Sequence, residues 1–234
     1  RSREKLVAMG QLAAGVAHEL NTPLGNILGY AQLMRGATAA PEERNRYADI
    51  VVDEARRCSR VVQDLLAYAR KDSCSGETCD VNQTVRELLE AFVHCRLQRY
   101  GIEVDLELAP EPQLAEGGCG ELDIALTNVM ANAIQALAAT PQPRIAIRTW
   151  TEPAHVAIAV SDNGPGVPHQ ARSRLFDPFF TTKDVGQGSG LGLFISQAVV
   201  TRRGGRIDFD ASHGGGACFV IRLPRVDVAR VRAS

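Results

Sequence analysis

The sequence predicts two domains: an α hairpin that forms a dimeric four-helix bundle, followed by an α/β sandwich whose mixed sheet carries helices on one face. Near the N-terminus, apolar residues recur every seven positions, which is the spacing of a helix packed in a bundle. Further along, strand-like and helical stretches alternate with glycine clusters. They lack the regular order of a βαβ fold, which favours a mixed sheet.

The first stripe predicts one long helix, and a second stripe predicts its antiparallel partner. The first comprises Leu6, Ala13, Leu20, Ile27 and Met34, with Met9, Val16 and Tyr30 set between them. After a break from Gly36 to Pro41, the second comprises Val51, Ala55, Cys58, Val62, Leu65 and Ala69. One hairpin buries such narrow faces poorly, so we expect a homodimer.

Composition sets the expected domain boundaries. The stretch from Lys71 to Asp80 loses the stripe and has the Ser/Gly content of a linker. We therefore expect a helical hairpin over 1–72, a linker over 73–80, an α/β domain over 81–225 and a tail over 226–234.

Periodicity and capping residues predict the elements of the α/β domain. Asp80 or Asn82 caps a helix that reaches about Arg99. Further helices are expected over 121–138 and about 191–202, and strands over 102–108, 144–150, 156–161, 206–211 and 217–223.

Bulk composition excludes several classes of partner. The 234 residues carry a formal net charge of -1, which gives no reason to expect nucleic acid as a partner. No apolar stretch approaches the roughly 20 residues that span a bilayer, so no membrane segment is expected. Six cysteines are scattered along the chain. Reduced thiols are the expectation, with a redox pair of Cys74 and Cys79 as the alternative and no zinc site.

His18 is the first candidate for chemistry. In the heptad it falls on the side away from the seam, so we expect it to face solvent. Glu19 lies beside it as a proton acceptor, Asn21 and Thr22 lie within reach, and Pro23 removes a helical hydrogen bond and tends to bend the helix. The alternative is an ordinary surface or core histidine.

The segment His18-Glu19-Leu20-Asn21-Thr22-Pro23-Leu24 resembles the H box of sensor histidine kinases. The resemblance implies that His18 accepts the phosphoryl group and that Glu19 assists removal of its proton. It also implies that Thr22 orients water for dephosphorylation of a partner response regulator.

Two asparagines and an aspartate are candidates for nucleotide binding. Asn128 and Asn132 lie four positions apart, so their amides share one helix face and could tie Mg²⁺ to a triphosphate. Asp162 ends an apolar strand and precedes Gly164 and Gly166, where a carboxylate could accept a hydrogen bond from adenine. The alternatives are surface asparagines and a simple Asp-Gly turn.

An aromatic segment and a glycine cluster follow. The run from Phe176 to Lys183 suits a lid whose lysine reaches a phosphate, or else a buried anchor. The cluster Gly188-Ser189-Gly190-Leu191-Gly192 leads into a helix and could cradle phosphates. A Rossmann loop with Asp208 or Asp210 on a ribose is rejected, because the residues before the cluster are polar rather than an apolar strand.

In order, these segments resemble the N, G1, F and G2 boxes of the histidine kinase ATPase domain. The resemblance extends from about Leu6 to Leu223 and implies ATP and Mg²⁺ as cofactors, with Asn128 and Asn132 as metal ligands. It implies a fold shared with Hsp90, gyrase and the mismatch-repair ATPases. The implied nucleotide contacts are Asn128, Asn132, Asp162, Gly164, Gly166, Phe180, Thr182, Lys183, Gly188, Gly190, Leu191 and Gly192.

The expected function is therefore an ATP-dependent autokinase that phosphorylates His18 and passes the phosphoryl group to an aspartate of a response-regulator receiver domain. Regulator phosphatase activity is expected too. We expect a cytoplasmic chain, which also suits the cytoplasmic part of a larger, membrane-anchored sensor. The alternative is an ATP-dependent scaffold that signals by docking without phosphotransfer.

Overall fold

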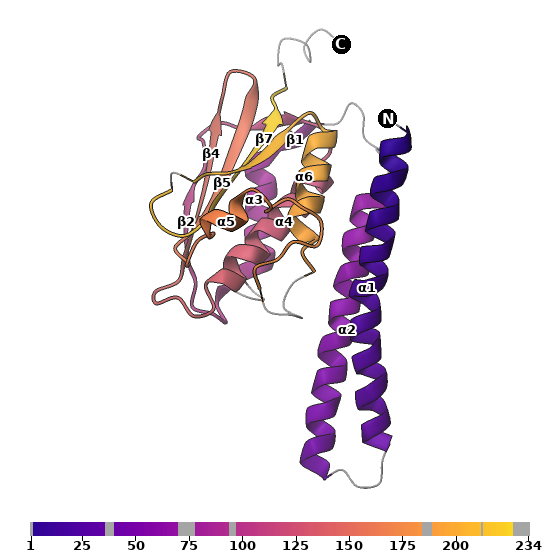
Figure 1. Ribbon diagram of the computed structural model, residues 1–234. Coiled ribbons are helices and arrows are strands. Elements are labelled where there is room, and N and C mark those ends of the chain that lie inside the picture. The colour runs from indigo at the N-terminus through magenta and orange to yellow at the C-terminus, as the bar shows by residue number, and fades with distance from the viewer. Residues whose placement is uncertain are drawn as a thin grey trace. The chain divides into compact units, whose positions relative to one another are not determined.

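The computed structural model describes residues 2–35, 40–69, 78–93, 97–183, 189–211 and 213–226. The chain divides into two compact units, residues 1–69 with 177–191 and residues 70–176 with 192–234. A helical hairpin makes up most of the first unit, and the second is an α/β fold (Figure 1). None of the helices within the described ranges is long and apolar enough to cross a membrane.

The hairpin of the first unit consists of α1, Ser2–Arg35, and α2, Pro41–Ala69. Proline suits the first position of α2 because the N–H that it lacks would have no helical partner there. Glu43 accepts a hydrogen bond from the N–H of Ala40 at 3.2 Å, which caps the same end. α1 continues through Pro23, which is buried.

The predicted stripe is confirmed on α1 from Val16 onward and is partly wrong on α2; the side chains of Leu6, Met9, Ala13 and Ala69 lie outside the described residues. On α1, Leu20, Ile27 and Met34 are half-buried. On α2, Ala55 and Val62 are exposed, whereas Arg57 and Val61 are buried. The buried face of α2 is rotated because it includes Arg57, whose guanidinium lies 3.1 Å from the carboxylate of Glu19 on α1.

Large apolar side chains remain exposed along both helices of the hairpin. Their exposed fractions run from 44% to 61%, and they are Leu24, Leu28, Leu33, Val52, Val62 and Leu66. These six exposed large apolar side chains on one hairpin indicate a surface that another protein chain covers.

The second unit is built on a five-stranded mixed sheet with the order β2-β4-β5-β7-β6. β2 and β4 are parallel, and the other neighbours are antiparallel. The helices α3, α4 and α6 cover one face of this sheet (Figure 1), as predicted. The elements in chain order are β1 Thr78–Asp80, α3 Val81–Phe92, β2 Glu103–Glu107, β3 Leu114–Glu116, α4 Cys119–Ala136, β4 Arg144–Thr151, β5 His155–Asp162, α5 His169–Arg172, α6 Gly192–Arg202, β6 Arg206–Phe209 and β7 Cys218–Pro224.

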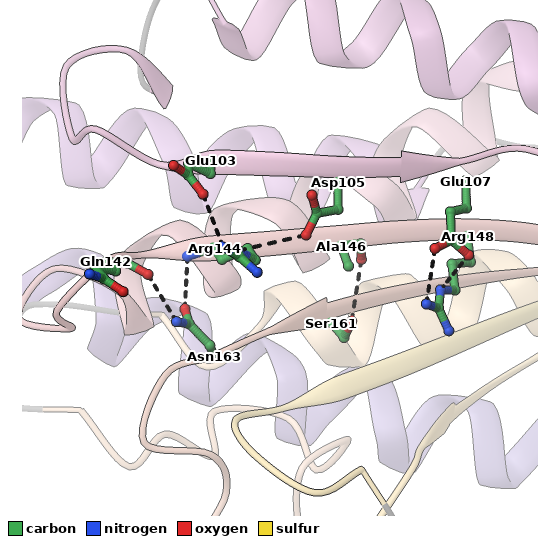
Figure 2. Close-up of polar contacts among 9 residues, drawn as sticks. All are labelled: Glu103, Asp105, Glu107, Gln142, Arg144, Ala146, Arg148, Ser161 and Asn163. Carbon is green, nitrogen blue, oxygen red and sulfur yellow. Dashed lines mark hydrogen bonds and ion pairs between the residues drawn. The ribbon is translucent and has the colours of Figure 1, made fainter.

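Alternation along β4 separates the core from the solvent face. Ile145 and Ile147 point into the core and are at most 1% exposed. Arg144 and Arg148 point outward, where they pair with carboxylates of β2 (Figure 2). These pairs are exposed and contribute little to stability, so burial of the apolar face holds the sheet to its helices.

The short elements and one helix end differ from the prediction. α3 ends at Phe92, whereas a helix to about Arg99 was expected. β1 pairs with β3 in a small sheet that was not predicted, and β1 occupies the end of the expected linker. Elements of three or four residues are too short to show a periodicity. Asp80 caps α3 as expected, by accepting hydrogen bonds from the N–H groups of Asn82 and Gln83.

The expectation of reduced cysteines is wrong for one pair. Cys79 of β1 is joined by a disulfide to Cys119, the first residue of α4. The two are 40 positions apart in the sequence, so no short spacing motif predicts that they pair. Cys74, the partner suggested for Cys79 by their proximity in the sequence, lies outside the described residues.

Candidate functional site

Asp162 lies at the end of the central strand β5 and is only 6% exposed. Its Oδ1 accepts hydrogen bonds from the N–H of Gly164 at 2.9 Å and from the N–H of Ala217 at 3.2 Å. Among the described residues, both hydrogen bonds to this carboxylate use Oδ1, which leaves Oδ2 for a ligand donor. Burial raises the pKa of Asp162, and the two backbone donors and His213 act in the opposite direction.

Glycines let two loops close around that carboxylate. Gly166 and Gly216 have φ angles of +73° and +79°, a region that favours glycine. A Cβ on Gly216 would collide with the carbonyl oxygen of Asp162, and a Cβ on Gly166 would lie 2.7 Å from the carbonyl oxygen of Gly216. Gly216 was not predicted as a site residue, although the run Gly214 to Gly216 between two strands was the available signal.

Asn163 fixes the loop that follows Asp162. Figure 2 shows its side chain between β5 and the segment before β4. Its Oδ1 accepts a hydrogen bond from the N–H of Arg144 at 2.7 Å, and its Nδ2 donates to the carbonyl of Gln142 at 3.0 Å. The side chain thus ties the end of one strand to the start of its neighbour, which holds Asp162 in place.

The predicted asparagine pair lies on α4, where Asn128 faces α6. The Nδ2 of Asn128 donates to the carbonyl of Gly192 at 3.0 Å and to Oγ of Ser196 at 3.2 Å. The structure therefore brings Asn128 and Gly192 together. Ser196 is fully buried and was not predicted, because a serine inside a helix gives no signal of its own.

The asparagines fit a magnesium ion that takes few ligands from the protein. Asn128 and Asn132 are both half-buried, one helical turn apart on α4. With Nδ2 of Asn128 engaged by α6, its Oδ1 is the atom suited to a hard cation. The described residues contain no cluster of three His, Cys, Asp or Glu side chains that could hold a metal. Phosphate and water oxygens would therefore complete the coordination of Mg²⁺, as they usually do.

The segment 177–191 contains all of the predicted lid except Phe176, together with the glycine cluster as far as Leu191, and it belongs to the first compact unit. Phe179 has a φ of 64°, a strained value for a residue with a side chain, and its N–H donates to the carbonyl of Gly190 at 3.1 Å. Gly190 is required there, because its φ is +66° and a Cβ would collide with the backbone of Phe179.

The other predicted residues of this segment differ in exposure. Leu191 is 1% exposed, Phe180 is half-buried and Thr182 is exposed. Lys183 is half-buried, and burial lowers its pKa. Gly188 lies outside the described residues.

The predicted phosphoacceptor region lies on α1. The backbone of His18 is helical, whereas its side chain lies outside the described residues. Thr22 is exposed one turn later. The Oε2 of Glu19 accepts a hydrogen bond from Nη2 of Arg57 on α2 at 3.1 Å, and the two side chains are 21% and 10% exposed. The Nε of Arg57 is buried without a hydrogen-bond partner among the described residues.

Both units match known families. Residues 8–74 match "His Kinase A (phospho-acceptor) domain", and residues 117–227 match "Histidine kinase-, DNA gyrase B-, and HSP90-like ATPase". His18 lies within the first match, and Asn128, Asp162 and Gly192 lie within the second.

Individual proteins show the same likeness. The chain is 36% identical over 226 residues to the signal transduction histidine-protein kinase AtoS of Escherichia coli (strain K12), covering 94% of this chain and 36% of AtoS. The mycobacterial sensor histidine kinase MprB has a solved structure that is 31% identical, with a TM-score of 0.53 over 64% of this chain and 97% of that chain. The structure of histidine kinase ThkA in complex with response regulator protein TrrA is 26% identical, with a TM-score of 0.80 over 97% of this chain and 64% of that chain.

Replacing the buried carboxylate should raise stability. Because burial raises the pKa of Asp162, its contribution to stability is full below the ordinary pKa of 3.8 and is lost as pH rises through the folded value. Asp162→Asn keeps an oxygen acceptor without the charge. We expect its free energy of unfolding, measured in urea, to exceed that of the unsubstituted chain by an amount that grows as pH rises from about 3.8 toward 7. The exposed Asp105→Asn should show no such trend. The prediction would be contradicted if the gain in free energy of unfolding from Asp162→Asn were smaller at pH 7 than at pH 4.

Proposed function

The chain belongs to the sensor histidine kinases, and from that premise we propose that it phosphorylates its own His18 from ATP and passes the phosphoryl group to an aspartate of a response regulator. The single observation that carries the proposal is the presence, on one chain, of a phospho-acceptor domain that contains His18 and an ATPase domain that contains Asp162. The chain spans about a third of the length of AtoS, so the activity of the whole protein is part of the proposal.

Nucleotide binding is assigned to the described groups by their chemistry. Oδ2 of Asp162 accepts a hydrogen bond from the exocyclic amine of adenine, and Gly164 and Gly166 allow the base to approach the backbone. Asn128 and Asn132 are the residues that would hold Mg²⁺, through their amide oxygens. Lys183, Gly190 and the start of α6 supply a cation and backbone N–H groups for the phosphates. Phe180 and Thr182 of the predicted lid and Leu191 of the glycine cluster lie in the same segment, 177–191, as does Gly188, which is outside the described residues.

Phosphoryl transfer then requires positioning and a proton acceptor. The transferred group passes through a loose transition state, so the protein mainly aligns the attacking nitrogen and neutralises charge. A bound magnesium ion would offset the charge of the phosphates. Glu19 takes the proton of His18, and the ion pair with Arg57 fixes where that carboxylate lies.

Two partners follow from the hairpin. The exposed apolar residues of α1 and α2 fit a second copy of the chain, with which the hairpin would complete a four-helix bundle. The partner for transfer is a response-regulator receiver domain, a proposal supported by the likeness to ThkA, whose structure contains the regulator TrrA.

Autophosphorylation is tested with γ-labelled ATP and Mg²⁺ on the purified chain. We expect acid-labile label on the protein, as a phosphohistidine requires, and its loss in His18→Gln and in Asn132→Ala. The matched control is His169→Gln, because His169 is exposed on α5, outside the predicted site. Nucleotide binding without label would favour the scaffold function instead.

The role of Arg57 is tested by its dependence on Glu19. Arg57→Gln should slow autophosphorylation about tenfold or more, since a general base contributes roughly 10²–10⁴-fold. In a Glu19→Gln background the same change should have little further effect, because Arg57 acts through that carboxylate. Arg57→Lys should restore part of the rate. Independent, multiplying losses in the double variant would show that Arg57 serves only the packing of the hairpin.

Regulator dephosphorylation is the remaining activity proposed. Thr22 is exposed on α1, one turn beyond His18, where its hydroxyl can orient water against a docked phosphoaspartate. We expect Thr22→Ala to slow the loss of label from a phosphorylated regulator while autophosphorylation continues. Ser59→Ala removes an exposed hydroxyl from α2 and is the control. Equal regulator half-lives with Thr22→Ala and the unsubstituted chain would remove this activity from the proposal.

A further inference from the structure

A disulfide fastens the beginning of α4 to the small sheet of the second unit. Cys79 is the middle residue of β1 and pairs with Ala115 of β3. β3 ends at Glu116, and only Gly117 and Gly118 separate it from Cys119 at the start of α4. The Cα atoms of the two cysteines lie 5.0 Å apart, within the range that a disulfide spans.

The two cysteines differ in their access to solvent. Cys79 is 2% exposed, whereas Cys119 is exposed. Cys119 begins a helix whose N-cap, Gly118, makes no side-chain hydrogen bond. The thiolate is the reactive form of cysteine, and exposure makes Cys119 the member of the pair that a small disulfide can reach. By contrast, burial is the main cause that raises the pKa of the Cys218 thiol to about 11, which disfavours its reactive thiolate form.

The helix that the disulfide fastens is the one that carries the asparagine pair. At its start, Glu121 of α4 lies 2.7 Å from Arg203, and the Arg203 side chain covers Gly117. Further along, Asn128 is bonded to Gly192 and Ser196 of α6. The disulfide is a further attachment, and it is covalent. It joins the start of α4 to β1, whereas the contacts of Glu121 and Asn128 do not involve the small sheet.

We propose that Cys79 and Cys119 form a reversible thiol–disulfide site through which small-molecule disulfides of the glutathione type regulate nucleotide binding. The Cys119 thiolate attacks the small disulfide, forms a mixed disulfide and releases one small thiol. The Cys79 thiolate then attacks the Cys119 sulfur and releases the second. The protein loses two electrons and two protons, and one small disulfide is reduced to two thiols.

The oxidised form holds the asparagine pair more rigidly. With the disulfide intact, the first turn of α4 is tied to β1, and the amides of Asn128 and Asn132 are fixed before nucleotide binds. Reduction leaves that turn held by the Glu121–Arg203 pair, by packing and by the two-residue connection to β3. Oxidation therefore raises nucleotide affinity, a consequence that rests on the proposed function.

The site itself is tested by counting thiols. The whole chain is equilibrated in glutathione buffers that range from reducing to oxidising, then denatured and alkylated. Mass spectrometry then gives the number of alkylated thiols. All six cysteines should react after reduction and four after oxidation. Cys119→Ser should give five in both buffers, and the control Cys58→Ser should give five and then three. Six thiols in every buffer would overturn the site, as would a disulfide that persists in Cys119→Ser.

The regulation is tested by the Kd of a non-hydrolysable ATP analogue with Mg²⁺. We expect reduction to weaken binding about fivefold, the lower range of typical coupling between sites, and Cys119→Ser to bind like the reduced chain in both buffers. Its melting temperature should match that of the reduced chain, which shows that it folds. Equal Kd values in both redox states, with the thiol count changing, would overturn the regulation. Absence of nucleotide binding in every state would instead count against the proposed function, while the thiol counts would still decide the site.

Discussion

The burial of one carboxylate, that of Asp162, is the constraint on which the candidate nucleotide site depends. A charged group so removed from water is tolerated only when it is hydrogen-bonded, and here the donors are the backbone N–H groups of Gly164 and Ala217. β5 lies between β4 and β7, and Asp162 ends β5 where β4 and β7 begin. Three segments therefore meet at the end of β5, the central strand of the sheet. Their approach is closer than side chains permit, which explains why Gly216 is needed beside Asp162.

Local patterns sufficed for much of the fold and for several site residues. The heptad stripe predicted α1, because few structures other than a packed helix place an apolar residue at every seventh position over so long a stretch. The apolar strand before Asp162 and the glycines after it placed a carboxylate at a strand end. The spacing of Asn128 and Asn132 placed both on one face of α4, as observed. In each case the information lies within one element or the turn that follows it.

Contacts between distant elements escaped prediction. Asn128 meets Ser196 across 68 positions, and Glu19 meets Arg57 across 38. The rotated face of α2 has the same origin, since an arginine is buried when a partner on another helix compensates its charge. The disulfide between Cys79 and Cys119 depends on β1 and β3, whose three-residue strands carry no period. These contacts depend on the tertiary structure, and the local patterns of the sequence do not reveal them.

The division of the chemistry between two compact units has a further consequence. His18 lies on the hairpin, whereas Asp162 and the asparagine pair lie in the α/β unit, so phosphoryl transfer requires the two to meet. Within one chain, or within the proposed dimer, that meeting occurs at an effective concentration set by the assembly rather than by the total amount of protein. The rate then depends on how well each unit is prepared. In the proposed mechanism, Arg57 positions Glu19 beside the phosphoacceptor His18, and the disulfide holds the start of α4, the helix that carries the asparagine pair. These two attachments share no residue and lie in different units, so a change in redox state should alter nucleotide affinity without altering the proton acceptor beside His18.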